Sequence, residues 1–208
     1  MKWSSMGLFA SPLIKIHLDD LEDAKRFFYA NLKNDDTVQN LTHYHSFENV
    51  FDLYSELNWL RLKIEKAGTF AYQDLLNYNK SGPMKITNAW FNLCQVGGSQ
   101  RKHSHANSLL SGTIYLEADN NTEIDFFHPL TTDSLHAELY DEPDTSLNQH
   151  GLKYHHQEVA VSVQTGDCLF WPSQLRHGYT NNKTPNRLTL SFNMMPESLN
   201  TTYQPSSP

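Results

Sequence analysis

The sequence is poor in cysteine and has neither a basic run nor a long apolar stretch. Its two cysteines, Cys94 and Cys168, lie far apart among 208 residues, which excludes a disulfide-rich scaffold and favours a reducing compartment. Lys and Arg number 16 against 23 Asp and Glu, so the formal net charge is -7. We expect no nucleic-acid partner, because attraction to phosphates is the main source of such binding.

The apolar segments are also too short to span a membrane, and the first 20 residues are too interrupted for a signal peptide. We therefore expect no membrane partner and a cytoplasmic location, or the host cytoplasm if a phage encodes the chain. Aromatic residues are plentiful, at 12%, as in many all-β proteins. The length fits one domain with a real core, and nothing in the pattern points to a particular oligomeric state.

The first 80 or so residues carry the three- to four-residue period of amphipathic helices. Asp19 or Asp20 is predicted to cap the first of these helices. The segment Ser81–Pro83 then ends the helical pattern. The predicted elements of this part are a short strand near Phe9–Ile16 and helices over 21–33, 47–67 and 70–79.

After Pro83 the period changes to two, which is typical of strands. Helices first and many short strands afterwards favour an α+β arrangement, with helices packed on the outside of a sandwich or barrel. A long polar stretch over 131–154 is expected to be a loop. The predicted strands cover 86–96, 111–118, 122–129, 156–164, 166–173 and 187–195.

One chemical signal comes from three histidines. His103 and His105 are two apart, so on a strand both imidazoles would point to the same side and could hold one metal ion. His177 follows an apolar strand and a turn at Pro172, and is predicted to begin the next strand. Each signal alone has a plainer interpretation, namely surface histidines or a histidine that only accepts or donates a hydrogen bond.

A second signal is the strict alternation of the segment 187–193. Its polar residues share one face and its apolar residues share the other. If the apolar face packs outward, an arginine lines the interior, and a buried arginine normally has an anionic partner. The alternative is a solvated edge strand. The polar face comprises Arg187, Thr189, Ser191 and Asn193, and the apolar face Leu188, Leu190 and Phe192.

Taken in order, the segments HSHANS, SGTIY, GDCLFWPS and RLTLSFN, with His177 before the last of them, resemble the 2-oxoglutarate/Fe(II)-dependent oxygenases. The pattern is most similar to bacterial and phage members that are like prolyl hydroxylases. The resemblance runs from about Phe9 to Asn193. It implies a mainly β fold with N-terminal helices, a double-stranded β-helix or jelly-roll, cupin-like barrel. The expected single domain covers 1–198, with a helical part over about 18–80, a barrel over about 84–196 and a disordered tail over 199–208.

The resemblance also implies the chemistry and the residues that carry it. Fe(II) would be the metal, 2-oxoglutarate the co-substrate and dioxygen the oxidant, and the products would be a hydroxylated substrate, succinate and carbon dioxide. No catalytic side chain is expected beyond the metal site, although Trp90, Phe126 and Trp171 could wall it. The implied metal ligands are His103, His105 and His177, and the implied 2-oxoglutarate contacts are Arg187, Thr189, Tyr115 and Asn92.

His105 departs from the pattern of the larger superfamily, which has a carboxylate at this position. Either His105 is the third ligand, making a neutral three-histidine site, or it stays off the metal and water fills the place. We favour His105 as a ligand, because Asp119 and Asp125 lie on later segments and no carboxylate is close to position 105 in the sequence. A neutral ligand set would leave the iron site more positive.

Two other functions fit the same residues. A metal-binding cupin, acting as a dioxygenase, isomerase or sensor without 2-oxoglutarate, matches the spacings from Gly97 to His103 and from Gly166 to Pro172, but it lacks the expected glutamate near Leu109. Arg187 favours the oxygenase. A non-enzymatic structural jelly-roll protein is the third interpretation. The substrate is expected to be a peptide side chain or a small molecule, and the acidic chain favours a neutral or basic one.

Overall fold

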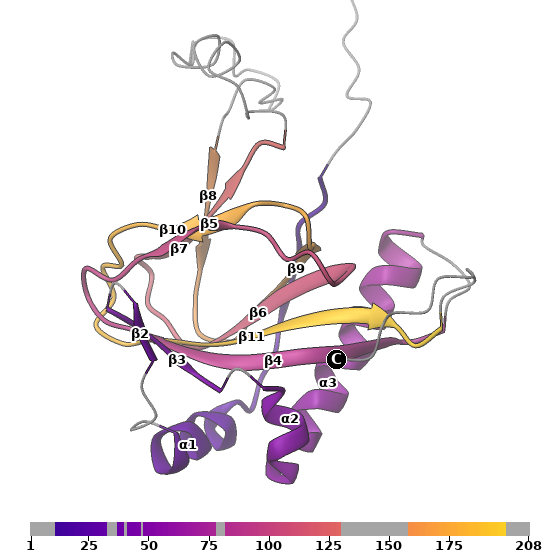
Figure 1. Ribbon diagram of the computed structural model, residues 1–208, viewed down its shortest axis with the longest axis horizontal. Coiled ribbons are helices and arrows are strands. Elements are labelled where there is room, and N and C mark those ends of the chain that lie inside the picture. Colours follow the sequence, from indigo (N-terminus) through magenta and orange to yellow (C-terminus); the bar gives the residue numbers. More distant parts are fainter. Residues whose placement is uncertain are drawn as a thin grey trace, which may run out of the picture.

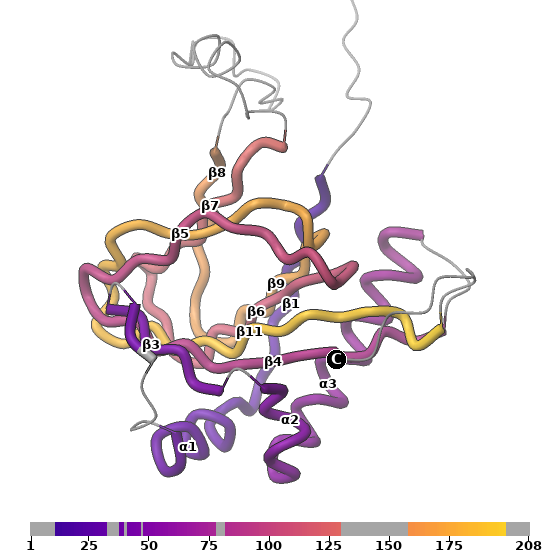
Figure 2. Tube along the Cα trace, in the orientation of Figure 1, coloured from indigo at the N-terminus to yellow at the C-terminus, as the bar shows by residue number. Residues whose placement is uncertain are grey.

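The computed structural model describes residues 11–32, 37–39, 41–46, 48–77, 82–129 and 158–198. In this part of the chain two antiparallel sheets face each other, and helices cover the outer face of the larger sheet (Figures 1 and 2). The helical elements are α1 (Glu22–Asn31), α2 (Val50–Leu53), the 3-10 turn η1 (Ser55–Leu57), α3 (Asn58–Phe70) and the π-helical turn η2 (Ala71–Leu75).

The larger sheet has seven strands in the order β1-β9-β6-β11-β4-β3-β2, and the smaller sheet has four in the order β5-β10-β7-β8. The strands are β1 (Ile14–His17), β2 (Thr37–Gln39), β3 (Thr42–His45), β4 (Met84–Cys94), β5 (Gln100–His103), β6 (Leu110–Glu117), β7 (Thr122–Phe127), β8 (Glu158–Val163), β9 (Asp167–Pro172), β10 (His177–Tyr179) and β11 (Arg187–Pro196).

The predicted double-stranded β-helix with N-terminal helices is confirmed. Within the described residues no strand pair joins the two sheets, so they form an open sandwich rather than a closed barrel. The predicted loop over 131–154 and tail over 199–208 lie outside the described residues. Among the helices that the structure describes, none has both the length and the apolar character needed to cross a membrane.

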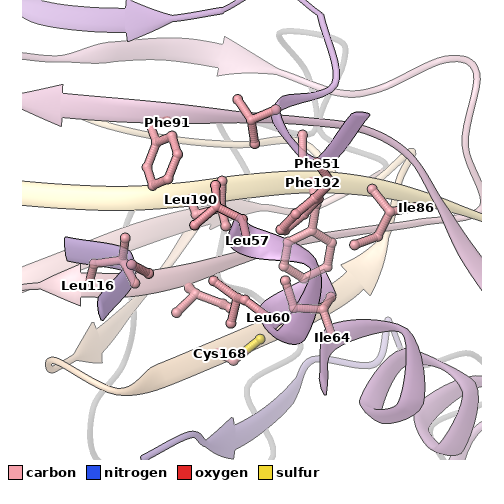
Figure 3. Packing of buried hydrophobic residues seen from close by; sticks show 14 of the residues in the cluster. Phe51, Leu57, Leu60, Ile64, Ile86, Phe91, Leu116, Cys168, Leu190 and Phe192 are labelled. Atoms are coloured by element: carbon pink, nitrogen blue, oxygen red, sulfur yellow. The ribbon is translucent and has the colours of Figure 1, made fainter. Parts of the chain in front are cut away.

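The pleat of the larger sheet separates an apolar face from a polar one. On β11 the side chains of Leu188, Leu190 and Phe192 are fully buried in the core that the helices cover, and Figure 3 shows Leu190 and Phe192 there. Of the two interpretations of this alternating segment, the structure therefore has the one in which the apolar face packs outward. Leu60 and Ile64 of α3 pack against the same face. The main core therefore lies between the helices and the larger sheet, and the polar side of β11 faces the space between the two sheets.

The helical part differs from prediction in three places. The N-cap of α1 is Leu21, which makes no side-chain cap bond, so capping by Asp19 or Asp20 is wrong. Asp20 instead adopts a positive φ of 62°. The single helix expected over 47–67 is broken at Tyr54, which has an extended backbone. The strands β2 and β3 were not predicted, because three or four residues are too few to show a period.

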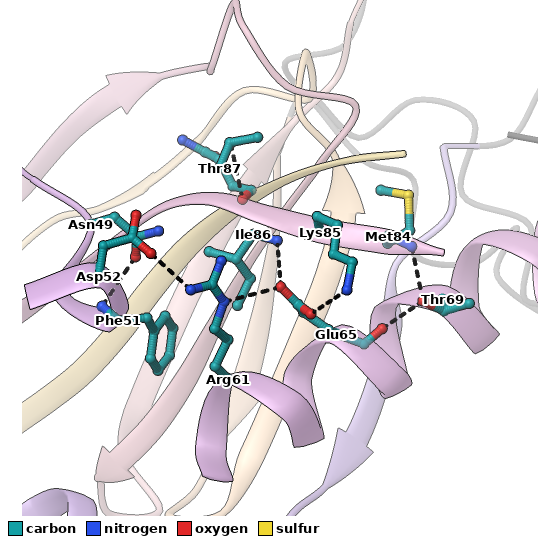
Figure 4. A network of polar contacts seen from close by, with 11 residues as sticks. Asn49, Phe51, Asp52, Arg61, Glu65, Thr69, Met84, Lys85, Ile86 and Thr87 are labelled. Atoms are coloured by element: carbon teal, nitrogen blue, oxygen red, sulfur yellow. Dashed lines mark hydrogen bonds and ion pairs between the residues drawn. The ribbon is translucent and has the colours of Figure 1, made fainter. Parts of the chain in front are cut away.

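A buried carboxylate fastens α3 to β4. Glu65 is 7% exposed, and its oxygens accept hydrogen bonds from Arg61 Nε, Lys85 Nζ and the backbone N–H of Ile86, each at 3.2 Å (Figure 4). One turn later, Thr69 Oγ1 accepts a bond of 2.9 Å from the backbone N–H of Met84. A buried charge is tolerated when it is paired and hydrogen-bonded in this way, so these bonds fix α3 against the first residues of β4.

Gly112 is required by the close packing of the central strand β6. A Cβ atom at this position would lie 2.5 Å from the carbonyl oxygen of Leu169 and against the ring of Phe192. We expect Gly112→Ala to lower the free energy of unfolding by about 2 kcal/mol, because overpacking a core forces the backbone to shift. Chemical denaturation would measure this loss.

The matched control is Gly68→Ala in α3. Its Cβ would meet mainly the flexible end of Met194, and alanine is the better helix former by about 1 kcal/mol. We expect this variant to change stability by less than about 1 kcal/mol. Equal losses in the two variants would contradict the packing argument.

Candidate metal centre

Strand pairing in the smaller sheet brings two distant histidines together. β5 and β10 are antiparallel neighbours, and His103 lies directly opposite His177 with 4.4 Å between ring centroids. His105 lies beyond the end of β5 rather than on the strand, where its backbone N–H donates to the carbonyl of Ser173 at 2.9 Å. Its ring centroid is 5.1 Å from that of His103 and 5.2 Å from that of His177.

The three imidazoles offer ligand atoms to a common point. One nitrogen from each of His103, His105 and His177 lies within 4.8 Å of the others, which makes them the single such group in the described residues. Imidazole binds metal ions at about 2.1 Å, so ligands of one ion lie about 3 to 3.5 Å apart. Small side-chain rotations would bring the three nitrogens to this spacing.

Two backbone carbonyls select the ring tautomer. Nδ1 of His103 lies 2.8 Å from the carbonyl oxygen of Arg101, and Nδ1 of His177 lies 3.0 Å from that of Leu175. A carbonyl oxygen accepts only, so Nδ1 carries the proton in both rings. The lone pair on Nε2 is then available for a metal, which is the usual arrangement of a ligating histidine.

Burial keeps the rings of His105 and His177 uncharged. It lowers the pKa of His105 to about 4 and that of His177 to about 3, and the neighbouring His103 contributes to both shifts. A metal binds the neutral form of imidazole, so at neutral pH no proton has to be displaced from these two rings. The residues present therefore fit a divalent metal that accepts nitrogen ligands, including Fe(II).

No carboxylate of the described residues joins the three histidines. Asp125 lies between Ile124 and Phe126, whose side chains are buried inside, so the pleat turns Asp125 away from the cluster. Asp119 is occupied in a turn, where it accepts a hydrogen bond from Thr184 Oγ1 at 3.0 Å. Both observations support His105 as the third donor.

Arg187 lies in the same interior and is only 3% exposed. Its guanidinium donates to the carbonyl of Glu123 at 2.7 Å and to the hydroxyl of Tyr115 at 3.3 Å. The ring of Tyr179 lies beneath it, 3.7 Å from Cζ. None of these partners is a carboxylate, and no ion pair links Arg187 to another residue of the described part. A buried cation without a counter-ion is costly, which points to an anionic ligand.

A small cavity connects Arg187 with the histidine cluster. Within the described part of the chain, two buried polar atoms beside it, Asn92 Oδ1 and Trp171 Nε1, have no hydrogen-bond partner. The amide nitrogen of Asn92 already donates to Ser191 Oγ at 3.0 Å and to Thr189 Oγ1 at 3.3 Å. The cavity thus offers a cation, hydroxyls and an unused donor. Besides the histidines and Arg187, its lining includes Trp90, Asn92, Gln100, Thr113, Tyr115, Trp171, Tyr179, Thr189 and Ser191.

Most residues expected at the site are brought together here, and the aromatic ones lie close to the histidines. The ring of Trp171 is 4.7 Å from that of His177, and the ring of Phe126 is 6.2 Å from it. Tyr179, which stacks on Arg187, was not identified from the sequence. The spacing could have indicated it, because residues 177 and 179 lie on the same face of a strand and Tyr179 therefore points to the same side as His177.

The region that carries this geometry matches a known family. Residues 88–193, just over half of the chain, match the family model described as "Putative 2OG-Fe(II) oxygenase". The chain belongs to this family. The oxygenase resemblance of the sequence motifs is thereby confirmed, with Fe(II) as the metal and 2-oxoglutarate as the co-substrate of the family.

Solved structures give the same fold at low sequence identity. HygX from Streptomyces hygroscopicus with nickel and 2-oxoglutarate bound aligns with a TM-score of 0.59 at 13% identity, over 90% of this chain and 84% of that chain. A Pseudomonas putida prolyl-4-hydroxylase aligns at 0.55 and 12% identity, over 90% and 94%. The epimerase SnoN from nogalamycin biosynthesis aligns at 0.60 and 14%, over 89% and 78%. Among curated proteins, no sequence matches significantly.

The histidine cluster leads to a direct prediction. We expect His103→Ala, His105→Ala and His177→Ala each to lower the affinity for Fe(II) or Ni(II) at least about 10-fold, because each removes one donor. Anaerobic calorimetry would measure the affinities, with His43→Ala as a histidine variant outside the cluster. Near-normal affinity in His105→Ala alone would remove that residue from the coordination sphere.

Proposed function

We propose that His103, His105 and His177 hold Fe(II) in this oxygenase and that Arg187 binds the distal carboxylate of 2-oxoglutarate. The observation that carries the proposal is the buried guanidinium of Arg187, which forms no ion pair within the described residues and lines the same small cavity as the three imidazoles. The planar fork of arginine matches a carboxylate with two parallel hydrogen bonds. When bound, iron would supply the oxidising chemistry with dioxygen and 2-oxoglutarate as co-substrates. One oxygen atom of dioxygen would enter succinate as 2-oxoglutarate loses carbon dioxide, and the other would enter the new hydroxyl group of the substrate.

The side chains around Arg187 would orient the co-substrate. Tyr115 accepts a hydrogen bond from Arg187, so its own hydroxyl proton is directed elsewhere and can reach the same carboxylate. Thr189 lies next to Arg187 on the inner face of β11 and can donate its hydroxyl proton. The free Oδ1 of Asn92 cannot bond a carboxylate, so we assign Asn92 to positioning Thr189 and Ser191 through its amide nitrogen.

Aromatic rings would protect the site from water. Trp171 and Phe126 pack on each other with 5.3 Å between centroids, and both border His177. Both side chains are largely buried, so they shield one side of His177 from water. Excluding water keeps a reactive site from side reactions and strengthens the electrostatic contacts inside it.

The cupin alternative gives Arg187 no ligand. A cupin without 2-oxoglutarate would need its metal ligands alone, and Arg187 would then be a buried cation that forms no ion pair within the described residues. For the substrate, we propose a small molecule. Related structures contain hygromycin B, in HygX, and nogalamycin RO, in SnoN.

The experiment that tests the assignment is an anaerobic titration of the Fe(II) protein with 2-oxoglutarate. We expect a weak visible charge-transfer band, and succinate formation once oxygen is admitted. We expect Arg187→Ala to weaken 2-oxoglutarate binding about 10- to 100-fold and to leave the affinity for Fe(II) unchanged. The reason is that a hydrogen bond between charged groups contributes about 1.5–3 kcal/mol.

Two further variants make this test specific. Arg187→Lys keeps the charge but loses the planar fork, so its loss should be intermediate. Arg176→Ala removes an arginine that is not among the lining residues of this cavity, and the variant should bind 2-oxoglutarate normally. The proposal fails if wild type shows neither the band nor stabilisation by 2-oxoglutarate, or if Arg187→Ala binds it as well as wild type does.

A further inference from the structure

A second, larger cavity of about 440 Å³ opens beside the histidine cluster. It shares Trp90, Gln100, His103 and His105 with the small cavity next to Arg187. A molecule in it would contact two of the three candidate ligands directly, while the third, His177, borders only the small cavity. The larger cavity is therefore the place for a substrate. Its other lining residues are Gln39, Tyr44, Ser46, Asn88, Ser99, Arg101 and Asn193.

Trp90 gives this cavity a flat apolar surface. It lies on the inner face of β4, and its ring centroid is 5.8 Å from that of His105. An aromatic face of this kind binds a planar or ring-shaped group by stacking, which contributes about 1 kcal/mol beyond the buried area. Because Trp90 borders both the cavity and His105, a ring stacked on it would be next to the metal centre.

Some polar groups of the cavity lining are hydrogen-bonded to one another, and others are available to a ligand. The amide of Asn193 is engaged, since it donates to Asn88 Oδ1 at 2.7 Å and accepts from Ser111 Oγ at 2.7 Å. These bonds leave the amide nitrogen of Asn88 available as a donor toward the cavity. Within the described residues this nitrogen donates no hydrogen bond, and an available donor in the lining favours a ligand that carries oxygen acceptors.

The charge of the cavity is opposite to that of the chain. Arg101 is the one formally charged side chain of the described lining, and no carboxylate lines the cavity. Arg101 is exposed and makes no ion pair within the described residues. Its neighbour Lys102 faces away, with Nζ 4.0 Å from the ring centroid of Phe127. In a protein of net charge -7, this local cation selects for an anion at the cavity mouth.

We propose that the substrate is a small ring-bearing oxyanion, either a carboxylate or a phosphate ester. Its ring stacks on Trp90, its anionic group pairs with Arg101, and the carbon to be oxidised lies beside His103 and His105. The inference rests on the proposed function, because it takes the histidine cluster as the oxidising centre. It departs from the neutral or basic substrate expected from the net charge, since the lining of a cavity decides what binds there.

The test compares four probes that share one benzene ring and differ in charge. Phenyl phosphate, benzoate, benzyl alcohol and benzylamine are titrated into protein loaded with Ni(II) and 2-oxoglutarate, a state in which no turnover occurs. We expect the two anions to bind about tenfold more tightly than the alcohol, and benzylamine to bind most weakly. The order of phenyl phosphate and benzoate distinguishes a phosphate from a carboxylate substrate.

Variants assign the binding to individual residues. Arg101→Gln should abolish the preference for anions while the alcohol binds as before. Lys102→Gln, the matched control on the same strand, should retain the preference for anions. Trp90→Ala should lower the affinity for all four probes, and Trp90→Phe should restore part of that affinity. Metal and 2-oxoglutarate binding are measured on the same preparations, so a failure of the proposed metal and Arg187 assignment is seen separately.

Three results would overturn the inference. The first is similar affinity for all four probes, or tightest binding of benzylamine. The second is an anion preference that survives Arg101→Gln, because the anions would then be bound by the metal or at another site. The third is no binding of any probe at millimolar concentration by protein that binds Ni(II) and 2-oxoglutarate normally.

Discussion

The alternation of side chains along the larger sheet is the constraint on which the rest of the molecule depends. Each strand sends one row of residues to the helices and the next row to the space between the sheets. The helices cover the first row and form the main core with it, so the second row does not have to be apolar. This division leaves room for hydroxyls, amides and Arg187 between the two sheets. In a β-sandwich without covering helices, that space holds the main hydrophobic core.

A polar interior is stable only if its groups are positioned and paired. Hydroxyl and amide groups on β4, β6 and β11 bond to one another across the strands, as Asn92 does to Thr189 and Ser191. On the opposite sheet, Gly178 allows β10 to approach β5 closely, since a Cβ there would lie 2.7 Å from the carbonyl oxygen of Gln100. That approach sets His177 opposite His103. Two of the three candidate ligands, His103 and His177, therefore lie on paired strands, which hold side chains more rigidly than loops do.

The parts of the fold that could be predicted are those long enough to show a period. Six predicted strands overlap β4, β6, β7, β8, β9 and β11, and the helical segments overlap α1 and α3. The short strands β2 and β3 could not be found in this way. Local backbone choices also escaped prediction: Asp20 takes a left-handed conformation instead of capping α1, and an extended Tyr54 interrupts the expected second helix. Tertiary packing outweighs local propensity at such points.

The sequence by itself determined the chemistry of the site: the histidines, the arginine on an alternating strand, and the order of motifs that places the chain among the 2-oxoglutarate oxygenases. Only the tertiary structure decided which side chains meet. It brought His105 to the cluster although this residue lies beyond the end of β5, and it turned Asp125 away. It also placed Tyr179 beneath Arg187 and Arg101 in the lining of a cavity. The reason is that these contacts depend on the pairing register of strands far apart in the chain, which the spacing of residues along the chain does not contain.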